Sequence, residues 1–321
     1  MTMLDFHAQV QAQLPEVEER MRRVADGYHP ELSYALEQLL NSGGKRVRPT
    51  VTLLVAGMLN APHKHAVTVA AAVEMLHTAT LVHDDLIDGA TLRRGEPTLN
   101  AMWNSAATIL AGDFLFSQAA WLGSQAESVE VMQMFAKTLS IIVNGEVNQI
   151  FTRNVYPTRE EYNQRIYAKT ASMFELAAKA PAHLAGVFDK YGELLNTYGN
   201  SIGMAFQVVD DVLDFSSNEE TLGKPVASDL RHGLFTLPTL YYLEGKPADE
   251  RVQVLLDGGV LEEERMEALI DDIRTSGALQ RANEEAHRYV RLALDALEAM
   301  PACDERDGLA DLAEYVVQRL H

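Results

Sequence analysis

The sequence predicts an all-α fold built as one large domain. Apolar residues recur at the spacing of an amphipathic helix along almost the whole chain, whereas the alternating pattern of a half-buried strand is scarce. With 321 residues, 47% of them hydrophobic, the chain is long enough to bury a sizeable core. No stretch rich in Pro, Gly or Ser divides it. We therefore expect a single all-α domain over residues 1–321, with roughly ten helices or more.

Breaking residues give the order of the helices along the chain. Pro49 and the segment 60–62 bracket a helix at 50–60. A long helix follows at 64–89, and it is apolar on nearly every face, as expected inside a bundle. After the break at 95–97, the remaining expected elements are helices over 100–125, 128–151, 158–180, 184–217, 230–244, 260–274, 276–299 and 304–320, with a loop at 216–228.

Composition excludes several classes of protein. The chain carries 46 acidic against 27 basic residues, a net charge of −19, so nucleic acid is not an expected partner. The single cysteine, Cys303, allows no intramolecular disulfide, which favours a cytoplasmic location. We expect neither a signal peptide nor a transmembrane segment, because the first residues include acids and no run of about 18 apolar residues occurs.

Two acidic clusters with the same DDxxD spacing lie in apolar sequence. LVHDDLID (81–88) contains Asp84, Asp85 and Asp88, and VVDDVLDF (208–215) contains Asp210, Asp211 and Asp214. On a helix, the first and last aspartates of each cluster share one face, with the middle one about 100° round. Burying unpaired charges is costly, so metal coordination is the expected compensation. A solvated acidic face is the alternative, and the repeated spacing disfavours it.

The ligand chemistry favours Mg²⁺ or Mn²⁺ over zinc. All the candidate ligands are oxygens, and His77 and His83 are six residues apart, so they do not share a helical face. Neither cluster has the glycine-centred loop of an EF-hand. Because Mg²⁺ usually keeps positions for water and substrate phosphates, the two clusters are expected to bind a diphosphate from opposite sides.

Basic residues are clustered where an anion would need them. SGGKRVRP (42–49) sets Lys45, Arg46 and Arg48 after two glycines, which allow the backbone to approach an anion that arginine binds bidentately. An ordinary glycine turn before a helix is the alternative. Arg93 and Arg94 follow the first acidic cluster, where they could instead complement a helix C-terminus.

These motifs occur together in one order, which is GGKRVRP (43–49), LVHDDLIDGATLRRGEPT (81–98), GEVNQ (145–149), KT (169–170), FQVVDDVLD (206–214) and GKPVASDL (223–230). Over essentially the whole chain the sequence resembles the trans-isoprenyl diphosphate synthases, also called polyprenyl synthetases. The resemblance implies a single helical bundle of the isoprenoid synthase type with a central cavity for diphosphate and Mg²⁺. It also implies a homodimer, for which the apolar run at 100–120 is a candidate interface or, alternatively, core.

The resemblance implies a role for each motif. Both acidic clusters would hold Mg²⁺, three ions with substrate bound, or Mn²⁺, on the diphosphate of the allylic substrate. The implied contacts to that diphosphate are Arg93, Lys169, Lys224 and Gln207, and those to isopentenyl diphosphate are Lys45, Arg48, His77 and Arg94. For His77 a core histidine is the alternative. Thr170 is a further candidate, with a bond to its own helix backbone as the alternative. Leu234 stands where many relatives carry a second lysine.

The implied reaction is the head-to-tail trans condensation of isopentenyl diphosphate with dimethylallyl, geranyl, farnesyl or geranylgeranyl diphosphate. The allylic C–O bond ionises, the isopentenyl double bond attacks, and proton loss gives an allylic diphosphate that is five carbons longer. No protein nucleophile is needed. The residues expected to carry catalysis by this alkyl transferase (class EC 2.5.1) are Asp84, Asp85, Asp88, Lys169, Asp210, Asp211 and Lys224.

Product length is expected to be geranylgeranyl or longer. Ala79 and Thr80 stand where short-chain relatives often carry Phe or Tyr, and the first cluster lacks their two-residue insertion. Leu76, with Val55 and Phe135 from facing helices, would line the deeper pocket, although Phe135 is equally explained as core. The alternatives are a farnesyl diphosphate synthase, a class I terpene cyclase and a non-catalytic subunit of a heteromeric synthase.

Overall fold

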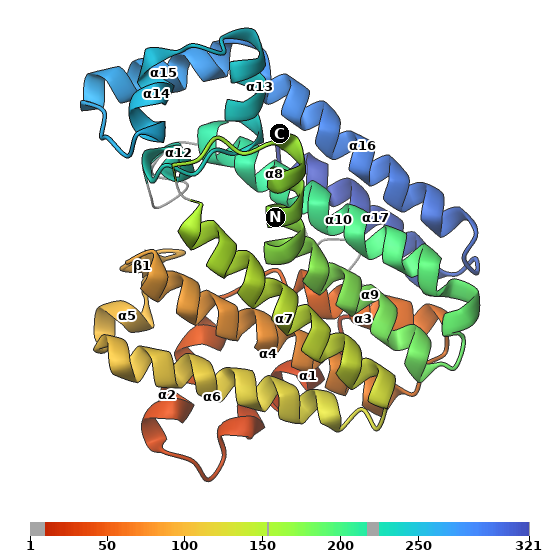
Figure 1. Cartoon of the computed structure of the whole chain (residues 1–321). Helices are drawn as coiled ribbons and strands as arrows, with labels where there is room; N and C mark the ends of the chain where they lie inside the picture. Colours follow the sequence, from red (N-terminus) through yellow and green to blue (C-terminus); the bar gives the residue numbers. More distant parts are fainter. Residues whose placement is uncertain (1–9, 153, 217–224, 321) are drawn as a thin grey trace. The chain divides into compact units, whose positions relative to one another are not determined.

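A computed structural model describes residues 10–152, 154–216 and 225–320 (Figure 1). Helices make up almost all of the ordered structure in these ranges. The strands within the described residues are two short ones, β1 (Leu92–Arg93) and β2 (Glu96–Pro97), which pair antiparallel. The prediction of an all-α fold is confirmed.

Two compact units divide the chain, and each unit is assembled from three segments. The first consists of Met1–Leu139, Met173–Gly199 and Ala296–Leu312, and the second of Ser140–Ser172, Asn200–Asp295 and Ala313–His321. The boundaries between these segments fall within or beside helices rather than in linkers. A single domain over 1–321 stays a prediction.

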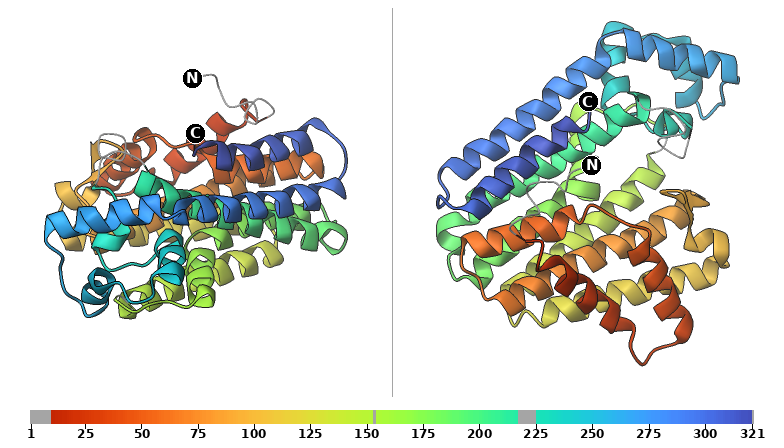
Figure 2. Two further views of the ribbon diagram at one scale, coloured as in Figure 1. Left: turned by 90° about the horizontal axis from the view of Figure 1, so that it is seen from above. Right: turned by 180° about the vertical axis from the view of Figure 1, so that it is seen from behind.

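The first unit is organised around α4 (His63–Ile87), which packs against α6 (Ser105–Ser124), α3 (Val47–Met58) and α1 (Leu14–Arg22), as Figures 1 and 2 show. Alanines and valines bury most faces of α4, so neighbouring helices approach it on several sides. The remaining elements of this unit are the 3₁₀ turn η2 (Arg23–Ala25), α2 (Pro30–Asn41), α5 (Leu99–Met102) and parts of α7 (Val129–Phe151), α9 (Ser172–Leu184), α10 (Phe188–Ser216), α16 (Ala278–Glu298) and α17 (Asp304–Gln318).

Among the described residues, α4 alone has the length and apolar composition that could cross a membrane. Its apolar 18-residue window has a mean hydropathy of 1.3, and 83% of that window is buried inside the protein. No such segment was expected from the sequence. Core helices pass the same test of length and composition, and the burial of α4 accounts for its composition.

The second unit contains the rest of α7, α10, α16 and α17 together with several shorter helices. These are α8 (Arg159–Ile166), the π-helical segment η3 (Tyr167–Ala171), α12 (Ser228–Arg231), α13 (Leu237–Gly245), α14 (Glu250–Leu256) and α15 (Glu263–Thr275). Its core includes Phe215, Phe235 and Leu269, which are at most 1% exposed. Helix α15 packs against α13 and α14.

Several helix boundaries differ from those expected, each for a local reason. Helix α3 begins at Val47, before Pro49, because a proline in the first turn removes no intrahelical hydrogen bond. The helix expected at 100–125 is broken at Trp103, which is extended, and Asn104 caps α6 by accepting a hydrogen bond from Ala107 N–H. The expected helix at 230–244 is two helices, α12 and α13.

The stretch expected as one helix at 158–180 consists of α8, η3 and α9, and it continues through Pro181 to Leu184. Helices α1, α2 and α14 were not expected from the sequence. Part of the loop expected at 216–228 lies outside the described residues, and its last residue, Ser228, begins α12.

Candidate active site

The first acidic motif lies at the end of α4 in the first unit. Asp84 and Asp85 are in the last turn, and Asp88 is the C-cap residue and is exposed. Asp85 is only 5% exposed. Its carboxylate accepts hydrogen bonds from Arg93 Nε at 2.9 and 3.0 Å and forms an ion pair with Arg93 Nη2 at 2.7 Å. The charge of this buried carboxylate is therefore balanced by a protein cation.

The β1–β2 hairpin carries both arginines that follow this motif. Arg94 and Gly95 form its turn with φ values of 53° and 82°, as a type I′ turn requires. The Arg94 guanidinium donates a hydrogen bond to the carbonyl oxygen of Gly43, so the hairpin contacts the loop that contains Gly43 and Gly44. Because α4 ends at Ile87, the two arginines do not lie in its last turn, and the helix-dipole alternative loses its basis.

The three basic residues of the GGKRVRP motif (43–49) have different surroundings. Arg46 adopts φ 46° and donates to Glu18 (3.0 Å), to Glu74 (3.2 Å) and to the carbonyl oxygen of Leu40 (2.9 Å), so its role is structural. Lys45 is exposed. Arg48 is 8% exposed, and its guanidinium lies 4.8 Å from the centre of the Phe174 ring, which fixes its direction.

His77 lies at the centre of this basic cluster. Its Nδ1 is buried and has no hydrogen-bond partner within the described part of the chain. Burial, and then the charges of Arg48, Arg94, Arg93 and Arg46, hold the pKa of His77 well below its usual value. The ring is therefore neutral at pH 7. Arg46 and Arg93 are paired with carboxylates, so the positive charge near His77 that could attract an anion comes mainly from Arg48 and Arg94. A core histidine with satisfied hydrogen bonds does not describe it.

The second acidic motif lies on α10 in the second unit, and its three carboxylates have different partners. Asp210 has a side chain 38% exposed and pairs with Arg319 Nη2 at 2.6 Å. Asp211 is 2% exposed and accepts a hydrogen bond from the Tyr162 hydroxyl at 2.7 Å. Asp214 is 4% exposed, and one of its oxygens accepts from the backbone N–H of Asp229 at 3.3 Å.

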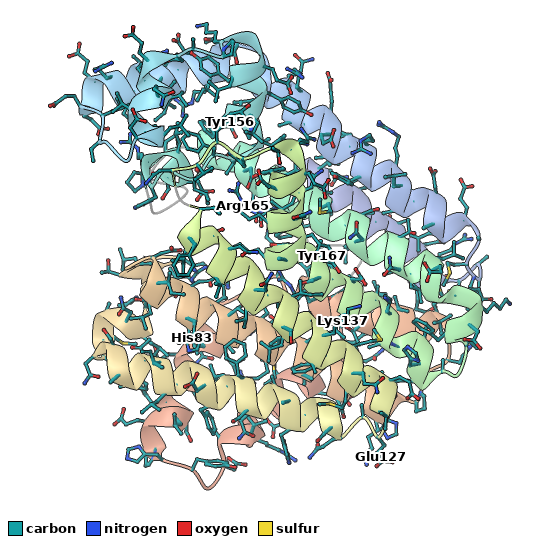
Figure 3. All side chains as sticks on the ribbon, viewed as in Figure 1. His83, Glu127, Lys137, Tyr156, Arg165 and Tyr167 are labelled. Carbon is teal, nitrogen blue, oxygen red and sulfur yellow. The ribbon has the colours of Figure 1, made fainter. Side chains whose placement is uncertain are left out.

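The π-helical segment η3 carries Lys169 and links Thr170 to this motif through Gln207. Lys169 Nζ lies 3.5 Å from Glu146 Oε1. The Thr170 hydroxyl donates to Gln207 Oε1 at 2.7 Å, and Gln207 Nε2 donates to Asp211 Oδ1 at 3.0 Å. The Thr170 hydroxyl thus donates to a side chain on α10 and not to the backbone of its own helix. Tyr167, labelled in Figure 3, begins the segment.

Two glycines allow η3 to pack closely in the second unit. A Cβ on Gly145 of α7 would lie 2.5 Å from Ala168 Cβ, and one on Gly203 of α10 would lie 2.3 Å from Ala171 Cα. No side chain fits at either position without a shift of the helices. This explains the first residue of the GEVNQ motif, which keeps α7 against the segment that carries Lys169.

The residues expected to set product length are all buried. Leu76, Ala79 and Val55 have no exposed surface, Thr80 is 7% exposed, and Phe135 on α7 is 3% exposed. Both a pocket floor and ordinary core would be buried in this way, so their role stays a prediction.

Two further positions were predicted, Lys224 and Leu234. Lys224 lies outside the described residues. Leu234 is partly buried, and its N–H donates to the carbonyl oxygen of Asp229 at 2.8 Å.

Sequence reasoning missed several residues that hold the site. Tyr162 and Arg319 contact the second acidic motif from other elements, and no local pattern marks them. Asp229, whose backbone N–H donates to Asp214, lies within the GKPVASDL motif (223–230), but no role was assigned to it. Glu74 did carry a signal, because an acid inside the apolar stretch AAAVEML needs a buried partner, and Arg46 is that partner.

The acidic residues fit a hard cation that keeps open coordination positions. In the described ranges, no three His, Cys, Asp or Glu side chains are close enough to hold an ion by themselves. Mg²⁺ commonly takes one or two carboxylates and fills its remaining positions with water and phosphate oxygens. Carboxylates in two motifs, with no cysteine or histidine cluster beside them, match this preference and not that of zinc.

An all-helical fold that carries two acidic motifs and a basic cluster around a neutral histidine is suited to an enzyme of phosphorylated substrates. The family model for polyprenyl synthetase matches residues 29–273. The solanesyl-diphosphate synthase 2 of Oryza sativa subsp. japonica is 33% identical over 96% of this chain and 77% of its own. The octaprenyl diphosphate synthase of Haemophilus influenzae is 37% identical over 88% of this chain and 86% of its own.

The crystal structure of a polyprenyl synthase from Caulobacter crescentus, complexed with calcium and isoprenyl diphosphate, superposes with a TM-score of 0.93. It is 34% identical and covers 98% of this chain and 97% of its own. The chain belongs to the polyprenyl synthetase family. The predictions of this family, of the all-α isoprenoid synthase fold and of a prenyltransferase of isoprenoid biosynthesis are confirmed.

Proposed function

We propose that the protein condenses isopentenyl diphosphate with an allylic diphosphate, head to tail and in the trans configuration, to make geranylgeranyl or a longer polyprenyl diphosphate. The observation that carries this proposal is the basic cluster around His77. His77 itself lies on α4, the helix that carries the first acidic motif, and that motif is intact. The names of the relatives support a product in the medium to long range.

The basic cluster is the proposed site for isopentenyl diphosphate. Arg48 and Arg94 are held in fixed directions by Phe174 and by the Gly43 carbonyl oxygen, so little side-chain entropy is lost on binding an anion. Exposed Lys45 adds a positive charge, and neutral His77 adds a hydrogen-bonding ring atom. A terpene cyclase has no need of this second anion site, which favours the condensing enzyme over that alternative.

The allylic diphosphate is proposed to bind with Mg²⁺ held by both acidic motifs, three ions with substrate bound, or with Mn²⁺. The proposed metal-binding residues are Asp84, Asp85, Asp88, Asp210, Asp211 and Asp214. Arg93, Lys169, Lys224, Gln207 and Thr170 are the proposed contacts to this substrate. All six aspartates and the basic loop are present, which disfavours a non-catalytic subunit.

In the proposed reaction the protein binds, orients and electrostatically stabilises two diphosphates. Mg²⁺, when bound, supplies positive charge that stabilises the leaving diphosphate. Arg93 carries further positive charge beside the first acidic motif, where it pairs with Asp85, and Lys169 is proposed to supply such a charge at the second. The allylic cation is attacked by the isopentenyl double bond, and the departing diphosphate is the proposed acceptor of the proton.

Product analysis tests the proposal directly. Purified protein, Mg²⁺, labelled isopentenyl diphosphate and each allylic primer, from dimethylallyl to geranylgeranyl diphosphate, should give a ladder that ends at twenty carbons or beyond. Products that stop at fifteen carbons would establish the short-chain farnesyl alternative. Failure to elongate any primer would overturn the proposal.

The protein is proposed to act as a cytoplasmic homodimer. An apolar stripe on α6, formed by Leu110 (66% exposed), half-buried Phe114 and Trp121 (51% exposed), supports a contact with a second copy at the run expected from the sequence. Exposed apolar side chains gathered on one helix face are typical of such surfaces. The mass measured by light scattering checks the oligomeric state, and cell fractionation checks the location.

A further inference from the structure

Tyr162, on α8, lies outside every motif, yet it contacts the second acidic motif directly. Its side chain is fully buried, and its hydroxyl donates a hydrogen bond of 2.7 Å to Asp211 Oδ2. A buried tyrosine hydroxyl needs a partner, but a backbone carbonyl would serve as well for stability alone. Because the partner is instead a carboxylate of this motif, the hydrogen bond indicates that Tyr162 helps to orient that carboxylate.

The second oxygen of Asp211 is fixed as well. Gln207, one turn earlier on α10, donates from Nε2 to Oδ1 at 3.0 Å. The orientation of the Gln207 amide follows from Thr170, whose hydroxyl donates to Oε1 at 2.7 Å and so leaves the NH₂ group for Asp211. Two supports, from α8 and from η3, thus meet at a single carboxylate.

The position of Tyr162 is itself rigid. A capping box between Thr158 and Glu161 fixes the start of α8. The guanidinium of Arg165 (labelled in Figure 3) lies 5.6 Å from the centre of the tyrosine ring and donates to the carbonyl oxygen of Phe235 at 2.6 Å. The hydroxyl is therefore presented to Asp211 in one direction.

We propose that Tyr162 is a positioning residue that orients Asp211 for a divalent cation, with the Thr170–Gln207 pair as the second support. This inference rests on the proposed function, in which the second acidic motif binds metal. Carboxylates that bind metal are commonly held by outer hydrogen bonds, and loss of such a partner typically weakens metal affinity about 10–100-fold.

The test is a titration with Mn²⁺ alone at pH 8, in which the electron paramagnetic resonance of free Mn²⁺ is measured. Tyr162→Phe removes the hydroxyl and keeps the ring. We expect it to weaken Mn²⁺ affinity about tenfold at the site where Asp210→Asn abolishes Mn²⁺ binding. Tyr198→Phe is the matched control, because Tyr198 is equally buried and its hydroxyl donates to the Leu309 carbonyl oxygen at 2.9 Å. It should lower stability and leave Mn²⁺ affinity unchanged.

The outcomes separate this inference from the function on which it rests. Unchanged Mn²⁺ affinity in Tyr162→Phe, when Asp210→Asn weakens binding, would overturn the positioning role and leave the proposed function standing. An equal loss in Tyr162→Phe and Tyr198→Phe would also overturn it, because the cause would be stability. If neither Asp84→Asn nor Asp210→Asn alters Mn²⁺ binding, the metal sites of the proposed function are overturned together with it.

A double-mutant cycle gives a second, independent check. If Tyr162 acts through Asp211, then Tyr162→Phe should add no further loss of Mn²⁺ affinity once Asp211→Asn is present. Fully additive losses would contradict the proposal. Should Tyr162→Phe fail to fold, Thr170→Val removes the other support. A several-fold loss of Mn²⁺ affinity is expected there, and no loss would overturn the inference.

Discussion

Buried carboxylates in the two acidic motifs are stabilised in different ways. Asp85 is paired with the guanidinium of Arg93, whereas Asp211 accepts hydrogen bonds from two neutral donors, Tyr162 and Gln207. Neutral donors do not offset the loss of hydration as a cation does. Burial, with a smaller contribution from the charge of Asp229, accordingly raises the pKa of Asp211 to about 7. In the absence of metal, this residue is therefore expected to titrate near neutral pH.

This shift predicts how stability depends on pH. Because the folded pKa of Asp211 lies above its ordinary value, the folded state binds more protons than the unfolded state between about pH 4 and 7. The contribution of Asp211 is fully present below that window and is lost as pH rises through 7, by an amount on the order of a few kcal/mol at most. With EDTA present, the urea midpoint should fall more steeply with rising pH in the wild type than in Asp211→Asn.

The comparison with Asp211→Asn is needed because His77 acts in the opposite direction. Its lowered pKa makes its contribution present above the ordinary histidine value and lost as pH falls below it. Both proteins share this effect, so it cancels in the difference between their curves. Parallel curves for the two proteins would contradict the account of Asp211.

A substitution at Ala79 tests which residue limits product length. Ala79 is fully buried on α4, one turn before the first acidic motif, where a larger side chain would block a growing chain. Ala79→Phe should shift the product distribution to shorter prenyl chains, as measured by reversed-phase chromatography of the dephosphorylated products. Folding is checked by thermal melting, since overpacking of a core can cost about 1–3 kcal/mol. A folded variant with unchanged product lengths would refute the prediction that Ala79 borders the path of the growing chain.

Among the elements, the π-helical segment η3 supports the second acidic motif through Thr170 and Gln207. A π-bulge inserts an extra residue into a helix, and such segments are frequent at functional sites. Here it presents Lys169 and Thr170, and Gly145 and Gly203 allow the flanking helices to approach its backbone. The packing of this segment thus depends on two glycines outside both acidic motifs.

We expect Gly203→Ala to be destabilising although alanine is the better helix former. The new Cβ would lie 2.3 Å from Ala171 Cα, and the overlap with backbone should cost about 1–3 kcal/mol, more than the roughly 1 kcal/mol gained in helix propensity. Displacement of Thr170 should also lower kcat. Gly245→Ala is the matched control, because nothing lies within 4 Å of a Cβ there. Equal unfolding midpoints for the two variants would refute this packing argument.

For the molecule as a whole, charge and exposed apolar surface have separate consequences. The net charge of −19 repels anions in general. Binding of an anion in the first unit therefore requires the local concentration of arginines around His77. The apolar stripe on α6 instead favours association with another protein surface, for which we proposed a second copy of the chain.

A charge placed in that stripe should disrupt association. Leu110→Glu puts a carboxylate at a position that is 66% exposed in the single chain, so the monomer should fold normally, while the dimer would have to bury an unpaired charge. Light scattering is expected to give the monomer mass for this variant and the dimer mass for the wild type. Val260→Glu, at a position 91% exposed in the second unit, should leave the mass unchanged. A wild type with monomer mass would exclude the homodimer.

Most helices, both acidic motifs and the basic loop could be predicted because they depend on local patterns. Apolar periodicity located α4 and α10, and the spacing of Asp84, Asp85 and Asp88 placed them together on one helix. The prediction missed the break at Trp103 and was wrong in starting α3 after Pro49, since the helix begins at Val47. Both features depend on capping and first-turn geometry, which periodicity does not report. The resemblance to a family, rather than spacing, supplied His77 and Lys169.

The sequence by itself determined the fold class, the two acidic motifs and the family, because these follow from periodicity and from ordered local motifs. Tertiary structure alone decided the partners of each charge: Arg93 for Asp85, Tyr162 for Asp211, and Glu74 for Arg46. The partners in the last two pairs are 49 and 28 residues apart in the chain, so no pattern within one helix reveals them. Burial makes each pairing necessary, since an unpaired charge in the core is costly, but only the packing of the helices selects which residue provides it.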